Sequence, residues 1–184
     1  LSQGVTHFHL SGPAEGPLIV CVHGLTTPSF VWEPLTKGLV RLGFRVLVYD
    51  LYRRGYSDRP DGLHDKGFFN TQLNDLLAHI EIEDPFHLIG YSMGGYGALI
   101  FAGAGVTQAS TEYSWGTPNG LLSAHIAGSD SHEALIDPRV KAVIAIGPWG
   151  NNAGFWDTEG LAGMRKPLLL MAGSADDVSV YDAM

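Results

Sequence analysis

The segment covering residues 86–104 restricts the fold of this 184-residue chain more than any other stretch. Residues 86–89 form a short apolar run with the length of a buried strand, and residues 98–104 place apolar side chains at helical spacing. The turn between them reads Gly90-Tyr-Ser92-Met-Gly94, which matches the pattern G-x-S-x-G. On a strand-to-helix turn, this pattern strains the serine backbone and exposes its hydroxyl above the sheet edge. The segment therefore predicts that Ser92 is a nucleophile.

The two glycines of this pentapeptide support the same interpretation. Side chains at Gly90 and Gly94 would collide with the neighbouring strand and helix, so the turn requires glycine at both positions. The following helix directs its N-terminal N–H groups and the positive end of its dipole at negative charge developing beside Ser92. The alternative is a glycine-rich structural turn that happens to contain a serine, and the flanking strand and helix disfavour it.

A second predicted strand supplies backbone donors for such a charge. Residues 18–22 are continuously apolar, which is typical of a central parallel strand covered on both faces. The strand ends at His23-Gly24, where glycine lets the chain turn sharply over the sheet edge. The N–H groups of the next residues then face the region above Ser92, which is the geometry of an oxyanion hole. We interpret His23 as structural rather than as a base, because it precedes the turn.

Two later predicted strands, residues 140–146 and 167–171, also end in turn residues. In open parallel sheets, ligands collect outside the carboxyl ends of the strands. Trp149 and Asp176 follow these two strands and are therefore candidate site residues. The alternative for Trp149 is ordinary packing, and the alternative for Asp176 is a turn or helix-capping carboxylate.

Charge and composition exclude several classes of partner. The net charge of −8 argues against nucleic acid or an anionic membrane as the main partner. No apolar run reaches the length of a membrane span, and the composition is that of a soluble globular protein. The one cysteine, Cys21, excludes an internal disulfide and is expected to be a packed thiol. His7 and His9 share one face of an early strand without an evident third ligand, so we expect a solvated edge face and no metal site.

The length predicts one domain covering residues 1–184. Within it, residues 105–138 show no clear strand, and we expect an insertion over the active-site edge that shapes substrate access. The chain begins at Leu1 and stops at Met184, just after a functional loop, which predicts a fragment of a longer protein. None of these features indicates the compartment or the oligomeric state.

Four motifs stand in a fixed order at strand ends: His23-Gly24, Asp50, the Ser92 pentapeptide, and Gly173-Ser-Ala-Asp176. In that order they resemble the α/β-hydrolase fold, and the resemblance covers essentially the whole chain. It implies a mostly parallel, doubly wound sheet with helices on both faces, incomplete at the C-terminus. Residues 18–98 look like the branch of esterases, perhydrolases and C–C hydrolases. Residues 138–184 look more like the dienelactone-hydrolase-like and cutinase-like branch.

The resemblance assigns roles around the serine. Ser92 matches the nucleophile, and the N–H of Met93, which follows it, matches one oxyanion donor. The second donor is the N–H of Leu25, with Thr26 as the runner-up and as a residue that would line the substrate site. Two such donors would stabilise the tetrahedral oxyanion formed when Ser92 attacks an acyl carbonyl.

The resemblance also assigns the acid and an aromatic residue. Asp176 matches the triad acid that orients the base, with Asp177 as the runner-up. Trp149 matches an aromatic residue that lines the substrate cleft in cutinase-like enzymes. This mechanism requires no metal and no organic cofactor, and neither has a convincing site in the sequence.

The sequence departs from the family at the base. Triad order in this fold is Ser, Asp, His, yet none of the eight histidines follows Asp176. The plainest explanation is that the base lies beyond Met184. The alternative is that His125 or His132, in the predicted insertion, swings over Ser92.

The polar loop of residues 50–60 contains the other departure. We expect Arg53 and Arg54 to tie this loop to itself rather than to bind substrate. Related loops often carry glycine where Arg54 stands, which would alter the loop but not the chemistry.

Together these residues predict a serine hydrolase that cleaves small-molecule carboxylic esters through an acyl-enzyme on Ser92. The same machinery would serve perhydrolysis, lactone opening or polyester cleavage. Haloalkane dehalogenation is disfavoured because it needs a carboxylate where Ser92 stands. The hypothesis from another class is a non-catalytic α/β-hydrolase-fold protein that binds a small ligand or partner. The missing histidine favours this hypothesis, and the intact serine turn and Asp176 disfavour it.

Overall fold

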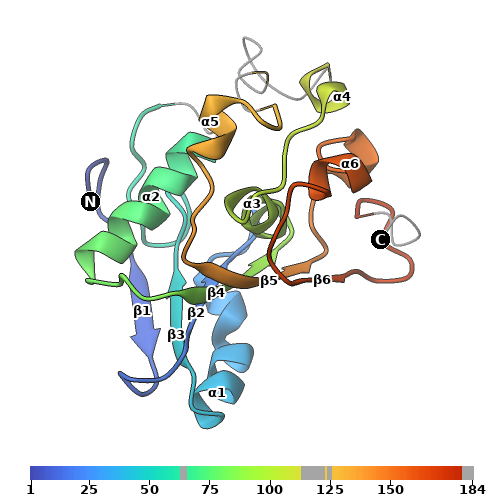
Figure 1. Cartoon of the computed structure of the whole chain (residues 1–184). Coiled ribbons are helices and arrows are strands. Elements are labelled where there is room, and N and C mark those ends of the chain that lie inside the picture. Colours follow the sequence, from blue (N-terminus) through green and yellow to red (C-terminus); the bar gives the residue numbers. More distant parts are fainter. Residues whose placement is uncertain (63–65, 113–122, 124–125, 180–184) are drawn as a thin grey trace.

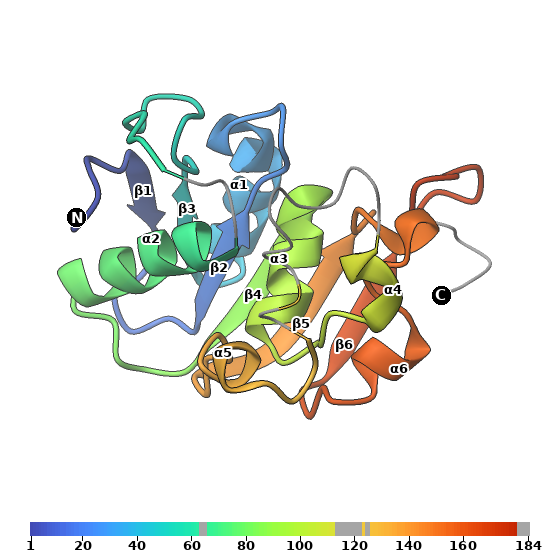
Figure 2. The ribbon, with the colours of Figure 1, turned by 90° about the horizontal axis from the view of Figure 1, so that it is seen from above.

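The computed structural model describes residues 1–62, 66–112, 123 and 126–179, and these residues build one six-stranded sheet. Its strands are β1 (Phe8–Ser11), β2 (Leu18–Val22), β3 (Arg45–Tyr49), β4 (Phe86–Tyr91), β5 (Val140–Ile146) and β6 (Leu168–Met171). The spatial order is β1-β3-β2-β4-β5-β6, as Figure 2 shows from above. β1 is antiparallel to β3, and the other neighbours are parallel. The predicted mostly parallel α/β sheet is confirmed.

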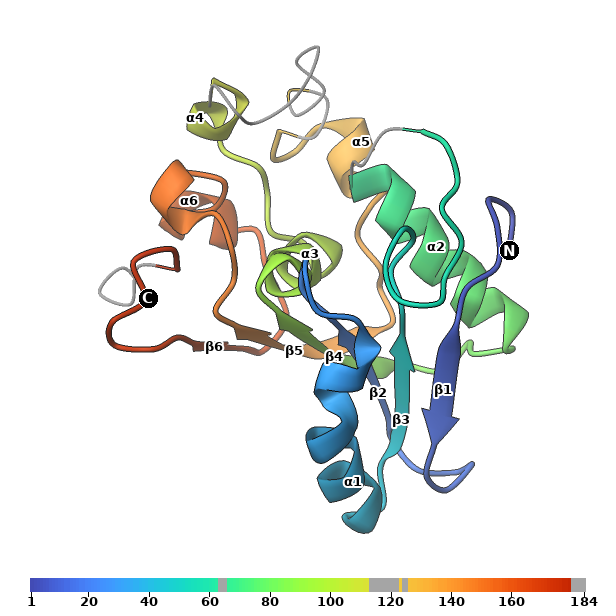
Figure 3. The same ribbon diagram turned by 180° about the vertical axis from the view of Figure 1, so that it is seen from behind.

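Helices cover both faces of this sheet (Figures 1 and 3). α1 (Glu33–Arg41) lies on one face, and α2 (Lys66–His79) and α3 (Met93–Phe101) lie on the other. The shorter helices are η1 (Ser29–Trp32), α4 (Gln108–Thr111), α5 (Asp130–Glu133), η3 (Asn151–Ala153) and α6 (Thr158–Leu161). Among the described residues, no helix is both long enough and apolar enough to cross a membrane.

The surroundings of strand β2 explain why its sequence is apolar throughout. All five of its residues are buried, and successive side chains enter different cores. Leu18 and Val20 pack in the core that includes α2 and α3 residues. Ile19 and Cys21 pack on the opposite face, with Trp32. A strand covered on both faces needs apolar residues at every position, as predicted.

The strand order brings the site loops together. β2 pairs with β3 on one side and β4 on the other, and Val22 lies opposite Gly90 at the carboxyl ends of β2 and β4. The loops after these two strands therefore leave the sheet side by side. β4 pairs in turn with β5, and Tyr91 lies opposite Ile146. Three strand ends thus converge at one edge, where ligands bind in open parallel sheets.

Two local expectations change. The helix after the serine begins at Met93, so it covers the second half of the pentapeptide instead of starting further along. Residues 130–133 resemble a capping box with Asp130 as the cap, but helix α5 is capped one residue earlier by the hydroxyl of Ser129, which accepts from the N–H of His132. Much of the predicted insertion, residues 113–122 and 124–125, lies outside the described residues. The prediction that residues 105–138 shape substrate access therefore stays a prediction.

Candidate active site

Ser92 occupies the strained turn that its sequence predicts. Its backbone angles are φ 55° and ψ −121°, in a region that side-chain-bearing residues rarely adopt. Hydrogen bonds hold it there: its N–H donates to Ile146 at 2.9 Å, and its carbonyl accepts from Tyr96 and Trp149, both at 3.1 Å. Such strain typically costs about 1–3 kcal/mol and persists because the surroundings fix the backbone. The residue lies half-buried between β4 and α3.

Close approach of the backbone explains the glycines around Ser92. A Cβ at Gly94 would overlap the carbonyl oxygen of Val22 and lie 2.5 Å from that of His23. A Cβ at Gly90 would overlap the carbonyl oxygen of Gly94. Strand β2, strand β4 and helix α3 therefore meet more closely than any side chain would allow.

Gly24 brings the loop after β2 onto the serine. A Cβ at this position would lie 3.0 Å from the Cβ of Ser92 and 3.4 Å from its Oγ. The chain thus passes directly beside the hydroxyl, and the exposed Leu25 and Thr26 follow at once. On the other side, helix α3 starts at Met93, and no side chain of the described residues caps its N-terminus. The two predicted oxyanion-hole segments flank one hydroxyl.

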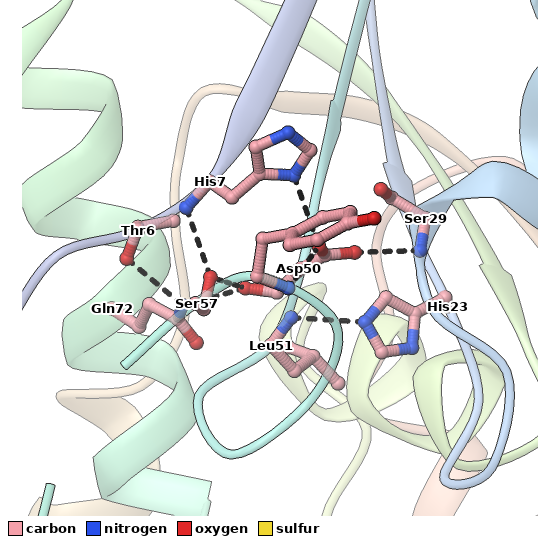
Figure 4. Close-up of polar contacts among 9 residues, drawn as sticks. Thr6, His7, His23, Ser29, Asp50, Leu51, Ser57 and Gln72 are labelled. Carbon is pink, nitrogen blue, oxygen red and sulfur yellow. Dashed lines mark hydrogen bonds and ion pairs between the residues drawn. The ribbon is translucent and has the colours of Figure 1, made fainter. Parts of the chain in front are cut away.

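His23 is held by two backbone groups and is fully buried. Its Nε2 accepts from the N–H of Leu51 at 2.9 Å (Figure 4). Its Nδ1 lies 2.6 Å from the carbonyl oxygen of Gly24. Since a carbonyl only accepts, the ring is neutral and carries its proton on Nδ1. Burial lowers the pKa of His23, which keeps it neutral. The structure gives His23 a structural environment, as expected, with neither nitrogen free to serve Ser92.

Trp149 lies beside the serine, as its position after β5 predicts. The backbone N–H of Trp149 donates to the carbonyl oxygen of Ser92, and the indole N–H of Trp156 donates to the carbonyl oxygen of Trp149, each at 3.1 Å. Trp149 is 38% exposed, and its ring packs against Phe155, with centroids 4.8 Å apart, and edge-on to Tyr96, with centroids 6.3 Å apart. An exposed aromatic ring on a fixed backbone next to Ser92 is suited to contact a ligand.

Asp176 lies on the loop after β6 and has two oxygens in different environments. Oδ1 accepts from the N–H groups of Val178 and Ser179, both at 3.0 Å. The Ser179 hydrogen bond, followed by the one from Val178, lowers the pKa of this carboxyl. Oδ2 faces Gly147, 3.5 Å from where a Cβ would stand on that residue. Asp176 therefore caps its own turn and also presents an oxygen to the chain leaving β5, whereas Asp177 is exposed.

Of the two alternative bases in the predicted insertion, the structure describes His132 but not His125. His132 is only 4% exposed, and both ring nitrogens are used. Nδ1 accepts from the N–H of Gly128, and Nε2 donates to the carbonyl of Ala104, each at 3.1 Å. The suggestion that His132 swings over Ser92 is wrong for this structure, because it would break both bonds. His125 lies outside the described residues. Among the described residues, no histidine hydrogen-bonds to Ser92 or Asp176.

The sequence did not predict two polar contacts, one made by His7 and one by Arg54. The expected solvated edge face is wrong for His7, whose Nδ1 pairs with the buried carboxylate of Asp50 at 2.9 Å (Figure 4). Arg54 bonds outside its own loop as well, because its Nε donates to the carbonyl oxygen of Leu25, in the loop after β2, at 2.5 Å. Arg53 does tie the loop to itself, through Pro60 and Gly62. The left-handed position that favours glycine is Arg53, with φ 66°, rather than Arg54.

The remaining candidate groups offer no second centre. Among the described residues, no group of three or more His, Cys, Asp or Glu side chains could hold a metal ion. Cys21 is fully buried, and burial raises the pKa of its thiol to about 12. A thiol in that state is not a nucleophile at neutral pH.

The burial of Cys21 predicts that its thiol does not react in the folded protein. Because the thiolate is the reactive form and the sulfur has no solvent contact, DTNB at neutral pH should release no chromophore. Unfolding in guanidinium chloride should then release one equivalent, since the chain has one cysteine. Rapid reaction of the folded protein would contradict the described packing of β2.

Comparisons with known proteins agree with this architecture. A family model described as "alpha/beta hydrolase fold" matches residues 17–107. The chain is 34% identical over 99 residues to the AB hydrolase superfamily protein YfhM of Bacillus subtilis (strain 168). It is 30% identical over 138 residues to RutD of Variovorax paradoxus (strain S110), which is provisionally named a carbamate hydrolase. These matches cover 51% and 71% of this chain but 34% and 49% of the two relatives, so the chain spans about half of their length or less.

A solved structure extends the match to nearly the whole chain. A hydrolase from Pseudomonas aeruginosa PA01 superposes with a TM-score of 0.66, covering 97% of this chain and 79% of that chain. The sequence identity is 18%, so this likeness shows the fold alone. The sheet order, the serine turn and these matches make the chain a member of the α/β-hydrolase fold superfamily.

Proposed function

We propose that this chain carries the nucleophile, the oxyanion hole and the acid of a serine hydrolase that cleaves carboxylic esters. The observation that carries the proposal is the convergence on Ser92. Its strained backbone presents the hydroxyl at the start of α3, and Gly24 brings the loop after β2 into contact with that side chain. A purely structural turn requires neither the strain nor the contact.

The chemistry follows from these positions. Ser92 Oγ attacks the acyl carbonyl as a base removes its proton, and the alcohol leaves to give an acyl-enzyme that water hydrolyses. The N–H groups of Leu25 and Met93 would hold the oxyanion, and loss of one such donor typically costs about 3–4 kcal/mol. Asp176 would orient the base and stabilise its charged form. Thr26 and Trp149 would contact the substrate.

Two kinds of alternative function remain: other reactions at the same nucleophile, and ligand binding without catalysis. Lactone opening, perhydrolysis and carbamate cleavage use the same nucleophile and differ in the leaving group or acceptor. RutD, by its name, supports an acyl substrate of this general kind. A protein that only binds a ligand is favoured by one observation: no histidine of the described residues pairs with Ser92 or Asp176.

Fluorophosphonate labelling tests the proposal. We would label the 184-residue chain and the longest open reading frame that contains it, each beside Ser92→Ala and the control Ser131→Ala. The longer protein is expected to be labelled and to hydrolyse p-nitrophenyl esters. Ser92→Ala should remove the labelling and lower kcat/KM at least ~10³-fold, while Ser131→Ala should retain both. A longer protein that is folded but neither labelled nor active would exclude the serine hydrolase and favour ligand binding.

A further inference from the structure

Arg54 contacts the predicted oxyanion-hole segment, and no sequence motif predicts this contact. Its Nε donates to the carbonyl oxygen of Leu25 at 2.5 Å, and its Nη1 donates to the carbonyl of Arg53 at 3.3 Å. The side chain is half-buried on the loop after β3 and reaches 29 positions back along the chain. Its guanidinium thus links the loop after β3 to the loop that passes beside Ser92.

This contact fixes a stretch that has little other support. Among the described residues, the Arg54 bond is the one hydrogen bond that the backbone of residues 25–27 makes. Leu25 and Thr26 are both exposed, with Leu25 at 48%. Side-chain packing therefore does little to hold the backbone of Leu25 and Thr26, and the Arg54 bond is the hydrogen bond that restrains it.

The geometry of the peptide unit explains how this restraint orients the neighbouring backbone N–H groups. Each peptide unit is planar and trans, so its C=O and N–H point in opposite directions. His23 holds the C=O of Gly24 and thereby sets the direction of the Leu25 N–H. Arg54 holds the C=O of Leu25, which belongs to the next unit. Leu25 is therefore fixed through the peptide on each side of it.

The loop after β3 supplies support at three successive points. The N–H of Leu51 holds the ring of His23, the carboxylate of Asp50 accepts the N–H of Ser29, and Arg54 holds Leu25 between them (the first two are drawn in Figure 4). Burial lowers the pKa of His23, so the ring stays in the neutral form that binds Gly24.

We propose that Arg54 is a positioning residue for the oxyanion hole: by holding the Leu25 carbonyl it fixes the peptide unit that carries the Thr26 N–H and, together with His23, keeps the Leu25 backbone in place, so that the N–H donors of this loop stay directed at the oxygen of the bound acyl group. This inference rests on the proposed function. A preorganised donor stabilises the oxyanion because it needs no reorientation when charge develops. Without Arg54 the Leu25 backbone can rotate, so the loss falls on the transition state rather than on substrate binding.

The experiment replaces Arg54 in the longest open reading frame that contains the chain. Arg54→Met removes the donor and the charge but keeps much of the apolar length, and Arg54→Lys restores one donor. We expect Arg54→Met to lower kcat for p-nitrophenyl acetate roughly 10- to 100-fold with little change in KM, less than the ~10²–10³ for losing a donor outright. The rate of fluorophosphonate labelling should fall by a similar factor. Arg54→Lys should recover part of both rates.

Arg53→Met is the matched control. Arg53 stands next in the same loop but bonds to Pro60 and Gly62, so its loss should affect stability without changing kcat. If Arg54→Met does not fold, Arg54→Gln replaces it as the uncharged variant. Unchanged kcat in a folded, uncharged variant, with activity still abolished in Ser92→Ala, overturns the role of Arg54 and leaves the proposed function intact. Absence of any Ser92-dependent turnover overturns both.

Discussion

Gly94→Ala is expected to lower the free energy of unfolding by about 3 kcal/mol or more and to abolish fluorophosphonate labelling. The new methyl group would overlap the carbonyl oxygen of Val22 and lie 2.5 Å from that of His23. Both obstacles are backbone atoms of a buried strand and its end, which cannot rotate away as a side chain would. Helix α3 must therefore move off β2, and Ser92 moves with it. Urea unfolding followed by circular dichroism measures the loss.

The same helix offers a control with the opposite sign. Gly97 has no heavy atom within 4 Å of its Cβ position, apart from the neighbours and helix backbone that any residue there would meet. Gly97→Ala should therefore stabilise the protein by about 0.5–1 kcal/mol through helix propensity alone. Equal effects of the two substitutions, in either direction, would show that close approach at Gly94 does not control the packing of α3.

This pair of glycines illustrates what a sequence can predict. The pattern around Ser92 is local, so strand, turn, helix and the need for glycine could be read together over residues 86–104. The central place of β2 in the sheet followed because a continuously apolar strand must be covered on both faces. The positions of Trp149 and Asp176 followed from the rule that loops meet at the carboxyl edge.

What the sequence could not predict depends on contacts between distant residues. His7 and Asp50 are 43 positions apart, and no spacing rule connects them. Arg54 reaches Leu25 only because β2 and β3 are neighbours, and its charge alone suggested a self-contained loop. His132 was a candidate base because it lies in the predicted insertion, yet its ring is bound to Ala104, 28 positions away. In each case a polar partner distant in the sequence decided the outcome, and sequence patterns do not identify such partners.

Asp50→Ala is the second substitution with a large expected effect, a loss of about 3–5 kcal/mol in the free energy of unfolding. The carboxylate is 2% exposed and accepts from the N–H groups of Ser29 at 2.8 Å and Tyr56 at 2.9 Å, and from His7 at 2.9 Å. Alanine leaves these donors without an acceptor inside the protein. Figure 4 shows how this residue joins His7, just before β1, to Ser29 at the start of η1.

Asp50→Asn separates the charge from the shape. The amide keeps an oxygen either for Ser29 or for Tyr56 and His7 but presents its NH₂ to the other side, so we expect a smaller loss of about 1–3 kcal/mol at neutral pH. Asp58→Asn is the matched control, because Asp58 is an exposed carboxylate in the same loop that accepts the N–H of Val5. Its substitution should cost less than about 1 kcal/mol. Urea unfolding of the three variants gives the comparison.

The pH dependence of the Asp50→Asn difference is the sharper measurement. Burial would raise the pKa of Asp50, but hydrogen bonds from Tyr56, Ser29 and His7 together outweigh it and hold the pKa below its ordinary value. The carboxylate therefore contributes stability above the unfolded pKa of about 4, and this contribution is lost as the pH falls through the lower folded value. The difference in unfolding free energy between wild type and Asp50→Asn should shrink below about pH 4. His23, whose lowered pKa destabilises the folded state as the pH falls below about 6.5, is present in both proteins and largely cancels. Parallel curves for the two proteins down to the acid limit would show that the donors around Asp50 do not favour its charged form.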